Sequence, residues 1–143
     1  MESRNVDSRQ AAAKSSSPPS TPRRLLVIDD EPLLGQTLVI AFRGRYDVEV
    51  ATTGGAALEL LENGASFDFI LCDMMLPDVS GRGIYERLAA TRPELIDRLY
   101  WTTGGALTAA TREFVDVHAS RCLEKPFTID EVDALVTNAR ASS

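Results

Sequence analysis

Short apolar runs recur along the chain, and each is followed by a segment whose apolar residues repeat at helical spacing. Runs of this length that end in turn-forming or charged residues are typical of buried parallel strands. One segment, 46–51, alternates apolar and polar residues, which predicts a strand nearer an edge of the sheet. The predicted strands cover residues 25–28, 46–51, 67–73, 99–103 and 120–125.

The segments between these runs predict amphipathic helices. Pro32 suits the first turn of a helix, and Gly54-Gly55 is expected to break the chain before the second one. Residues 128–131 form a capping box that opens the last helix. The apolar residues expected to face inward are Leu34, Leu38, Ala41, Phe42, Ala57, Leu58, Leu61, Ile84, Leu88, Ala110, Phe114, Val117, Val132, Leu135, Val136 and Ala139. Tyr85 also supports the third helix and is expected to be exposed on it.

Five strand–helix repeats predict an α/β protein with a doubly wound parallel sheet, helices on both faces and right-handed crossovers. The natural strand order for such a chain is 2-1-3-4-5. This order places the first, third, fourth and fifth strands together, so their carboxyl ends share one rim of the sheet. Those ends carry Asp29, Asp30, Asp73, Thr102, Thr103 and Lys125.

Asp73 is the centre of the predicted site. A carboxylate at the end of a buried strand is unfavourable unless something there needs its charge. Three clustered carboxylates repel one another and favour a divalent cation, and ligation by oxygen alone selects a hard ion such as Mg²⁺. The remaining carboxylate can then attack phosphorus to form an acyl phosphate, while Lys125 neutralises the phosphoryl oxygens and a hydroxyl holds one of them.

Composition and charge narrow the class of protein. The 143 residues suffice for one domain with a sizeable core, and 44% hydrophobic with 25% charged residues is ordinary for a soluble globular protein. The net charge of −6 argues against a nucleic-acid surface and indicates a cation or a basic partner. Because no apolar run could cross a bilayer and no signal-peptide pattern opens the chain, we expect no membrane association and a cytoplasmic location, with Cys72 and Cys122 reduced.

The residues at the rim belong to a distinctive set of motifs. Asp29-Asp30, Asp73, Thr103 and Lys125-Pro126-Phe127, together with the Met-Met-Leu-Pro-Asp-Val-Ser-Gly run that follows Asp73, resemble the receiver domain of bacterial two-component response regulators. Each dipeptide alone is a weak signal, whereas the complete set in this order is very specific. The resemblance covers about residues 23–140 and implies a flavodoxin-like (βα)5 fold.

The resemblance also implies roles for the acidic residues. Asp73 would be the phosphoacceptor, taking a phosphoryl group from a histidine kinase or a histidine phosphotransfer domain. Asp29, Asp30 and Asp73 would hold Mg²⁺, with the backbone carbonyl of Met75 as a further ligand.

Two more positions match the family at the ends of the fourth and fifth strands. Thr103, rather than Thr102, would be the switch hydroxyl, because it directly precedes the small residue Gly104. Lys125 would form an ion pair with the phosphoryl group. Its bond to Pro126 is expected to be cis, an isomer that costs only about 0.5–1 kcal/mol before proline.

Cys122 departs from the family pattern. The family often carries an aromatic residue at this position, three residues before the lysine, and that residue swings inward when the threonine moves. A cysteine leaves the phosphorylation chemistry intact but removes the usual aromatic readout. We therefore expect the signal to pass through the loop 103–105 and the helix after it, switching the face formed by the fourth helix, fifth strand and fifth helix.

Two other functions compete with a phosphoaccepting switch. The first is a phosphorylation-independent protein-interaction module of the same fold, for which Cys122 is the only support. The second is a phosphatase with an aspartyl-phosphate intermediate, but such enzymes usually need a second acid where this chain has Met75. The favoured interpretation is a signalling phosphoacceptor that catalyses only its own phosphorylation and dephosphorylation and is not a metabolic enzyme.

The predicted receiver domain fills residues 23–143, after a Ser/Pro-rich flexible linker over residues 1–22. No helix-turn-helix or other effector follows the last predicted helix, so we expect no direct binding to nucleic acid. The chain is either a stand-alone receiver or one cut from a larger protein such as a hybrid kinase. No residue specifies the cognate kinase or the downstream partner.

Overall fold

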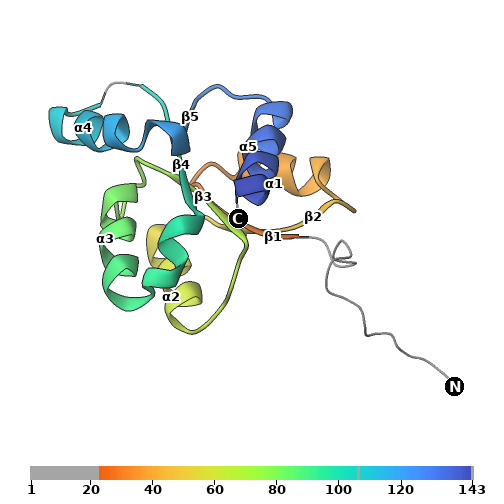
Figure 1. Ribbon diagram of the computed structural model, residues 1–143, viewed down its shortest axis with the longest axis horizontal. Coiled ribbons are helices and arrows are strands. Elements are labelled where there is room, and N and C mark those ends of the chain that lie inside the picture. Colours follow the sequence, from red (N-terminus) through yellow and green to blue (C-terminus); the bar gives the residue numbers. More distant parts are fainter. Residues whose placement is uncertain (1–22, 106, 143) are drawn as a thin grey trace, which may run out of the picture.

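A five-stranded parallel sheet forms the centre of the computed structural model, which describes residues 23–105 and 107–142 (Figure 1). The strand order β2-β1-β3-β4-β5 confirms the predicted doubly wound topology. The predicted linker over 1–22 lies outside the described residues. The strands are β1 (Arg23–Ile28), β2 (Tyr46–Ala51), β3 (Phe69–Asp73), β4 (Leu99–Thr103) and β5 (Cys122–Glu124).

Helices cover both faces of this sheet (Figure 1). The helices α1 (Pro32–Ala41) and α5 (Ile129–Ser142) lie together on one face. The opposite face carries α2 (Gly54–Glu62), α3 (Gly81–Thr91) and α4 (Ala109–Val117), with short 3-10 turns at η2 (Pro93–Arg98) and η3 (Ala119–Arg121). Within the described part of the chain, no helix is long and apolar enough to span a membrane.

The sheet separates two hydrophobic clusters, because alternate residues of a strand point to opposite faces. All five residues of β3 are buried, as a central strand covered on both sides requires. Burying each large apolar side chain contributes about 1.5–3 kcal/mol, so this core holds the strand ends in place. Toward α2 and α3 lie Leu26, Ile28, Ile70, Cys72 and Trp101. Toward α1 and α5 lie Leu25, Val27, Phe69, Leu71 and Tyr100.

Hydroxyl side chains cap the start of four helices. Thr53 accepts a hydrogen bond from the Ala56 amide at 3.0 Å, and Ser80 and Thr108 cap α3 and α4 in the same way. The predicted capping box at the start of α5 is confirmed, since each of Thr128 and Glu131 accepts a hydrogen bond from the other's backbone N–H. These bonds satisfy amides that the first helical turn leaves without partners.

The strand β5 is shorter than predicted. Pairing with β4 covers only Cys122–Glu124, and the preceding residues Ala119–Arg121 form a 3-10 turn. The Arg121 guanidinium donates hydrogen bonds to the backbone carbonyls of Asp97 and Leu99. These bonds hold the turn beside the start of β4, where an extended strand was expected.

Gly54 and Gly55 begin α2 instead of breaking the chain before it, which corrects the prediction. A Cβ atom on Gly54 would lie 2.9 Å from the Cβ of Val79. The first turn of α2 therefore packs closely on the loop after β3, and only glycine leaves room for that contact.

Three residues predicted to face inward are exposed. Ala41 is exposed, and the buried residue at the end of α1 is Phe42. In α4, Ala110 is exposed and Val117 retains 75% of its accessible surface. No residue of α4 is buried, so this helix packs on the domain only through half-buried side chains.

Candidate functional site

Three carboxylates converge at the carboxyl ends of β1 and β3. Asp29 and Asp30 directly follow β1, and Asp73 is the last residue of β3. One oxygen from each carboxylate lies within 4.8 Å of one oxygen from each of the others. Asp29 is 1% exposed and Asp73 is 7% exposed, whereas Asp30 faces solvent. The strand order thus brings together the acids that the sequence places at strand ends.

Lys125, directly after β5, contacts the two buried acids. Its Nζ atom lies 2.8 Å from Oδ2 of Asp29 and 3.3 Å from Oδ2 of Asp73. Partial burial disfavours the charged ammonium, but the hydrogen bonds and negative charges of these acids outweigh burial and raise the pKa of Lys125. Both buried carboxylates therefore have a cationic partner, without which their burial would be strongly unfavourable.

Backbone amides orient the same two carboxylates. The Glu31 amide donates a hydrogen bond to Oδ1 of Asp29 at 2.9 Å, and the Met75 amide donates one to Oδ1 of Asp73 at 3.0 Å. In each case Oδ1 accepts the backbone amide of the residue two positions later in the chain, and Oδ2 contacts Nζ of Lys125. This shared arrangement fixes the direction of both carboxylates before any ligand binds.

Thr103 ends β4 beside this cluster. In the strand register, Asp73 pairs with Thr102, and the next residue, Thr103, accepts a hydrogen bond from the Lys125 amide through its carbonyl at 2.6 Å. The Thr102 hydroxyl is buried and has no hydrogen-bond partner among the described residues. A Cβ atom on Gly104 would lie 3.3 Å from the Cβ of Lys125, so the position after Thr103 requires a small residue.

The Lys125–Pro126 peptide bond is cis, as expected. Beside it, a surface groove of about 360 Å³ opens next to the carboxylate cluster. Its lining comes from three loops and the start of α1, with Glu31, Leu34 and Phe127 as the larger side chains. A partner can therefore reach the cluster from this side.

The cluster fits a hard divalent cation. Asp29, Asp30 and Asp73 carry three negative charges, and Lys125 offsets one of them, which leaves a net charge of −2 at the site. All candidate ligands offered by these acids are carboxylate oxygens, the donor set that Mg²⁺ prefers. Asp29, Asp30 and Asp73 are the residues that would hold the ion.

Sequence reasoning missed the structural role of Asp78, which lies in the loop after β3. Its carboxylate accepts hydrogen bonds from the amides of Gly55 at 2.8 Å and Gly54 at 3.0 Å. The bond from Gly55 and then the bond from Gly54 hold the pKa of Asp78 below its usual range. These bonds join the loop after the phosphoacceptor candidate to the N-terminus of α2, where a negative charge is favourable.

An aromatic cluster lies where the family often has a switch aromatic. Cys122 is half-buried with a free thiol and pairs in the strand register with Trp101 of β4. Around Trp101 pack the rings of Tyr85 in α3 and of Phe114 and His118 in the α4 region. The Phe114 and His118 rings stack with their centroids 4.2 Å apart. The four rings come from three sequence segments, α3, β4 and α4 with its C-cap, so no local motif indicated the cluster.

Comparison with curated proteins gives relatives of two kinds, transcriptional regulatory proteins and sensor proteins. The chain is 30% identical over 113 residues to a probable transcriptional regulatory protein, TcrX, of Mycobacterium tuberculosis, covering 74% of this chain and 44% of TcrX. It is 32% identical over 90 residues to the aerobic respiration control sensor protein ArcB of Escherichia coli, covering 62% of this chain and 11% of ArcB. The chain therefore spans less than half the length of these relatives.

Solved structures agree with the fold. A putative response regulator from Chloroflexus aurantiacus superposes with a TM-score of 0.70 at 27% identity, over 85% of this chain and 99% of that one. A Francisella response regulator receiver domain gives a TM-score of 0.65 at 26% identity, with 85% and 99% coverage. The sequence profile of the response regulator receiver domain matches residues 25–137. With this match over most of its length, the chain belongs to the response regulator receiver domain family of two-component signalling systems.

Proposed function

We propose that this chain accepts a phosphoryl group on Asp73 from the phosphohistidine of a histidine kinase or histidine phosphotransfer domain, in a Mg²⁺-dependent reaction. The observation that carries the proposal is the arrangement of Asp29 and Asp73, each held by a backbone amide at Oδ1 and by Lys125 at Oδ2. Such pre-oriented charge at a buried strand end is what phosphoryl transfer requires of a protein.

The transfer moves the phosphoryl group from nitrogen to oxygen. The Asp73 carboxylate attacks phosphorus, a P–O bond forms, the P–N bond of the phosphohistidine breaks, and the imidazole leaves with the electron pair. Lys125 shifts from the Asp73 carboxylate toward the phosphoryl oxygens and offsets their charge. Mg²⁺ held by Asp29, Asp30 and Asp73, with the Met75 carbonyl, would supply the remaining positive charge. Thr103 would donate its hydroxyl to a phosphoryl oxygen.

The same residues support slow hydrolysis of the acyl phosphate, so the protein acts only on its own modification. The phosphoryl donor would approach over the groove of about 360 Å³ beside Lys125. Leu33, 70% exposed at the start of α1, and Met75, 47% exposed, provide apolar surface for that contact. A cytoplasmic location would place the two free thiols, Cys72 and Cys122, in a reducing compartment.

Phosphorylation would switch the face formed by α4, β5 and α5. The loop that joins Thr103 to α4 contains Gly105 with a φ of 72°, a backbone conformation that glycine adopts without strain. Because α4 has no buried residue, a shift of this loop can move the helix at little energetic cost. Charge added at one rim would thus bias a movable element.

Binding of beryllofluoride in the presence of Mg²⁺ tests the proposal. NMR titration should show saturable shifts around Asp73 and Lys125 in the wild type, and no such shifts in Asp73→Asn or without Mg²⁺. A second measurement, incubation with a low-molecular-weight phosphodonor followed by mass spectrometry, should show one added phosphoryl group in the wild type only. Absence of beryllofluoride binding and of phosphorylation in the folded wild type would refute the phosphoacceptor function.

The alternative is an interaction module that works without phosphorylation, favoured only by Cys122 at the switch position. It predicts equal partner affinity for the wild type with beryllofluoride, the wild type alone and Asp73→Asn. The phosphoacceptor proposal predicts that only the first differs.

A further inference from the structure

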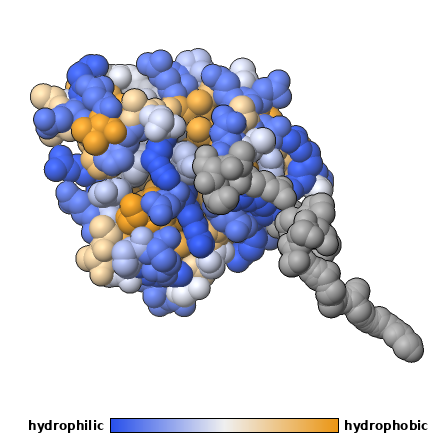
Figure 2. Space-filling model, viewed as in Figure 1, coloured by the Kyte–Doolittle hydropathy of each residue, from blue (hydrophilic) through white to orange (hydrophobic). Residues whose placement is uncertain are grey.

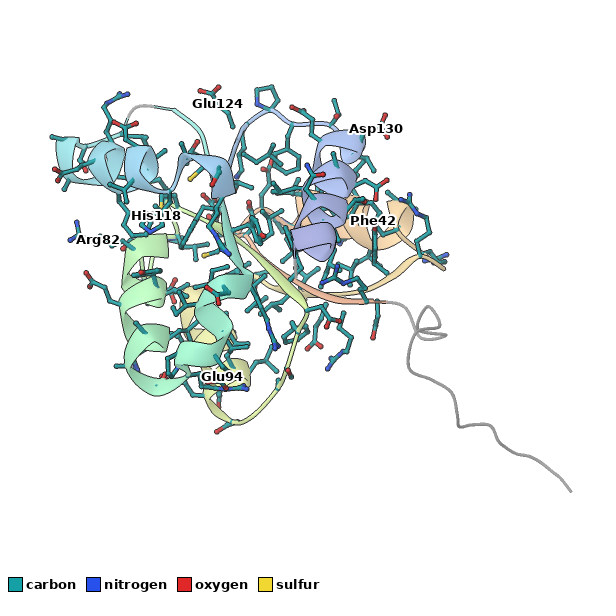
Figure 3. All side chains as sticks on the ribbon, in the orientation of Figure 1. Phe42, Arg82, Glu94, His118, Glu124 and Asp130 are labelled. Carbon is teal, nitrogen blue, oxygen red and sulfur yellow. The ribbon has the colours of Figure 1, made fainter. Side chains whose placement is uncertain are left out.

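A second surface feature lies away from the carboxylate cluster, between α3 and α4. The two helices enclose a groove of about 310 Å³, which we call the α3–α4 groove. Its wall is aromatic, formed by Tyr85, Phe114 and His118. Figure 3 shows His118 below α4, next to the first turn of α3 that carries Arg82. On the part of the surface formed by α4, Figure 2 shows hydrophobic atoms within hydrophilic surroundings.

The aromatic wall packs against a buried tryptophan. Trp101 is 1% exposed, and its ring lies 5.2 Å from Phe114, 5.3 Å from His118 and 5.9 Å from Tyr85, measured between centroids. Tyr85 and Phe114 meet edge to face at 5.4 Å. Trp101 is part of the core, while the other three rings are half-buried and line the groove. Aromatic faces carry negative electrostatic potential and attract cations placed over them.

The charged residues around the groove also favour a cation. Glu86 is paired with Arg82 at 3.2 Å, so these two charges offset each other. Glu113, on the opposite side of the groove, is exposed and has no ion-pair partner among the described residues. The groove therefore carries one uncompensated carboxylate beside three aromatic rings.

His118 adds a hydrogen-bond acceptor. Its Nδ1 atom lies 2.8 Å from the Phe114 carbonyl oxygen. Since a carbonyl oxygen only accepts, Nδ1 carries the proton, and in the neutral ring Nε2 holds a lone pair. Next to it, Val117 offers exposed apolar surface on which an aliphatic stem can lie.

We propose that the α3–α4 groove binds a cationic side chain, an arginine in preference to a lysine, presented by a partner protein. A guanidinium stacks on aromatic rings, pairs with a carboxylate and donates to a ring nitrogen at once, and its three methylenes cover apolar surface. The site is separate from Asp73, and none of its residues takes part in the proposed phosphoryl transfer.

The probe is acetyl-Gly-Arg-Gly-amide, and the matched control is the same peptide with citrulline, which keeps the shape and loses the charge. Binding is followed by NMR of the single histidine, His118, and by fluorescence of the single tryptophan, Trp101. The arginine peptide should shift both signals in a saturable way at millimolar concentrations. The citrulline peptide should bind at least about three-fold more weakly, because it lacks the attraction of a cation for the rings.

Two variants locate the interaction. Glu113→Gln, at an exposed position, should weaken binding of the arginine peptide about two- to five-fold without affecting the fold, and Phe114→Leu should weaken it by a similar factor. Glu59→Gln, exposed on α2, should leave the affinity unchanged. The proposal is wrong if the citrulline peptide binds equally well, if Glu113→Gln binds with wild-type affinity, or if neither His118 nor Trp101 responds.

Binding of the arginine peptide at the groove and binding of beryllofluoride at Asp73 can be tested separately. Asp73→Asn should bind the arginine peptide as the wild type does, and Glu113→Gln should bind beryllofluoride and Mg²⁺ as the wild type does. Equal binding of a norleucine peptide and the arginine peptide would show a purely apolar docking site and overturn the cationic assignment.

Discussion

At the scale of single residues, Asp78 shows how one side chain holds two loops in register. It follows Pro77 in the loop after β3, and its two carboxylate oxygens each accept one backbone amide from the start of α2. The carboxylate thus satisfies amides of a helix N-terminus in addition to the Thr53 cap. The loop that carries Asp73 into α3 is thereby fixed relative to α2.

Substitution of Asp78 should change how stability depends on pH. The folded state lowers the pKa of Asp78, so its stabilisation is present above the unfolded-state value of about 3.9 and is lost as the pH falls through the folded-state value. Asp78→Asn should therefore have a lower free energy of unfolding than the wild type at pH 7, and this difference should shrink in acid. Urea unfolding at pH 7 and at an acidic pH measures this difference between the wild type and the variant. Asp97→Asn, at an exposed position, is the control. A wild-type–variant difference that is the same at both pH values would contradict this assignment.

The residues of the carboxylate cluster were predictable, and Asp78 was not, for one physical reason. Asp29, Asp73 and Lys125 lie at strand ends, and a parallel sheet brings its strand ends together whatever the loops do. The partners of Asp78 are backbone amides, and every residue except proline carries one, so no side-chain pattern points to them. The phosphoryl contact of Thr103 remains a prediction, since the described geometry joins Thr103 to Lys125 only through the backbone.

At the scale of secondary-structure elements, Gly35 sets how closely α1 packs on β2. It is buried in the middle of the helix, and a Cβ atom there would lie 2.6 Å from Cγ1 of Val50. A contact that short requires the Val50 side chain, the strand or the helix to move. The absence of a side chain at Gly35 is therefore a packing requirement, although glycine is a poor helix former.

Gly35→Ala should destabilise the domain by about 1–3 kcal/mol, the usual effect of overpacking a core. The matched substitution is Gly55→Ala in the first turn of α2, where the new Cβ would meet Asp78 Oδ2 at 3.4 Å, an ordinary contact. That variant should be unchanged or more stable by up to about 1 kcal/mol, because alanine loses less backbone entropy. Urea unfolding compares the two. Similar stability changes in both would show that helix propensity, and not the contact with Val50, decides the result.

The helix α4 is the element expected to respond to phosphorylation. It has no buried residue, and the turn before it contains Gly105 in a left-handed conformation. On adding beryllofluoride and Mg²⁺, hydrogen exchange of the amides in α4 should change more than that of the buried strand β3. Asp73→Asn is the control and should show no change. Unchanged exchange throughout α4 in a wild type that binds beryllofluoride would exclude α4 as the readout.

Most elements were predictable from hydrophobic periodicity. The errors lie where side-chain hydrogen bonds or a surface groove determine the local structure. The strands 46–51 and 99–103 have the predicted bounds, because their apolar residues and their flanking turns agree. The fifth strand was predicted too long because Arg121 bonds to carbonyls near β4 and holds a 3-10 turn. The inward face of α4 was predicted too wide, because Ala110 and Val117 line the α3–α4 groove while Phe114 packs against the core.

At the scale of the whole molecule, the carboxylate cluster places negative charge at one edge of the sheet. The chain carries a net charge of −6, and three of its carboxylates share a site with a single ammonium. The core holds these strand ends in place, so the buried acids Asp29 and Asp73 cannot separate without unfolding. A cation that binds only the folded arrangement must therefore stabilise the whole domain by mass action.

Thermal unfolding with and without Mg²⁺ measures how far binding of the ion stabilises the domain. Stability should rise with Mg²⁺ concentration, by about 2.7 kcal/mol when the ion is at 100 times its Kd.

In Asp30→Asn, the exposed acid loses its charge, so repulsion from Asp29 and Asp73 falls while a ligand is removed. Without divalent cation this variant should be about 0.5–1 kcal/mol more stable than the wild type, and Mg²⁺ should stabilise it much less. Asp116→Asn, on exposed α4, removes the same charge elsewhere and should keep the full response to Mg²⁺. If Asp30→Asn responds to Mg²⁺ as the wild type does, the ion binds elsewhere and the carboxylate cluster is not its site.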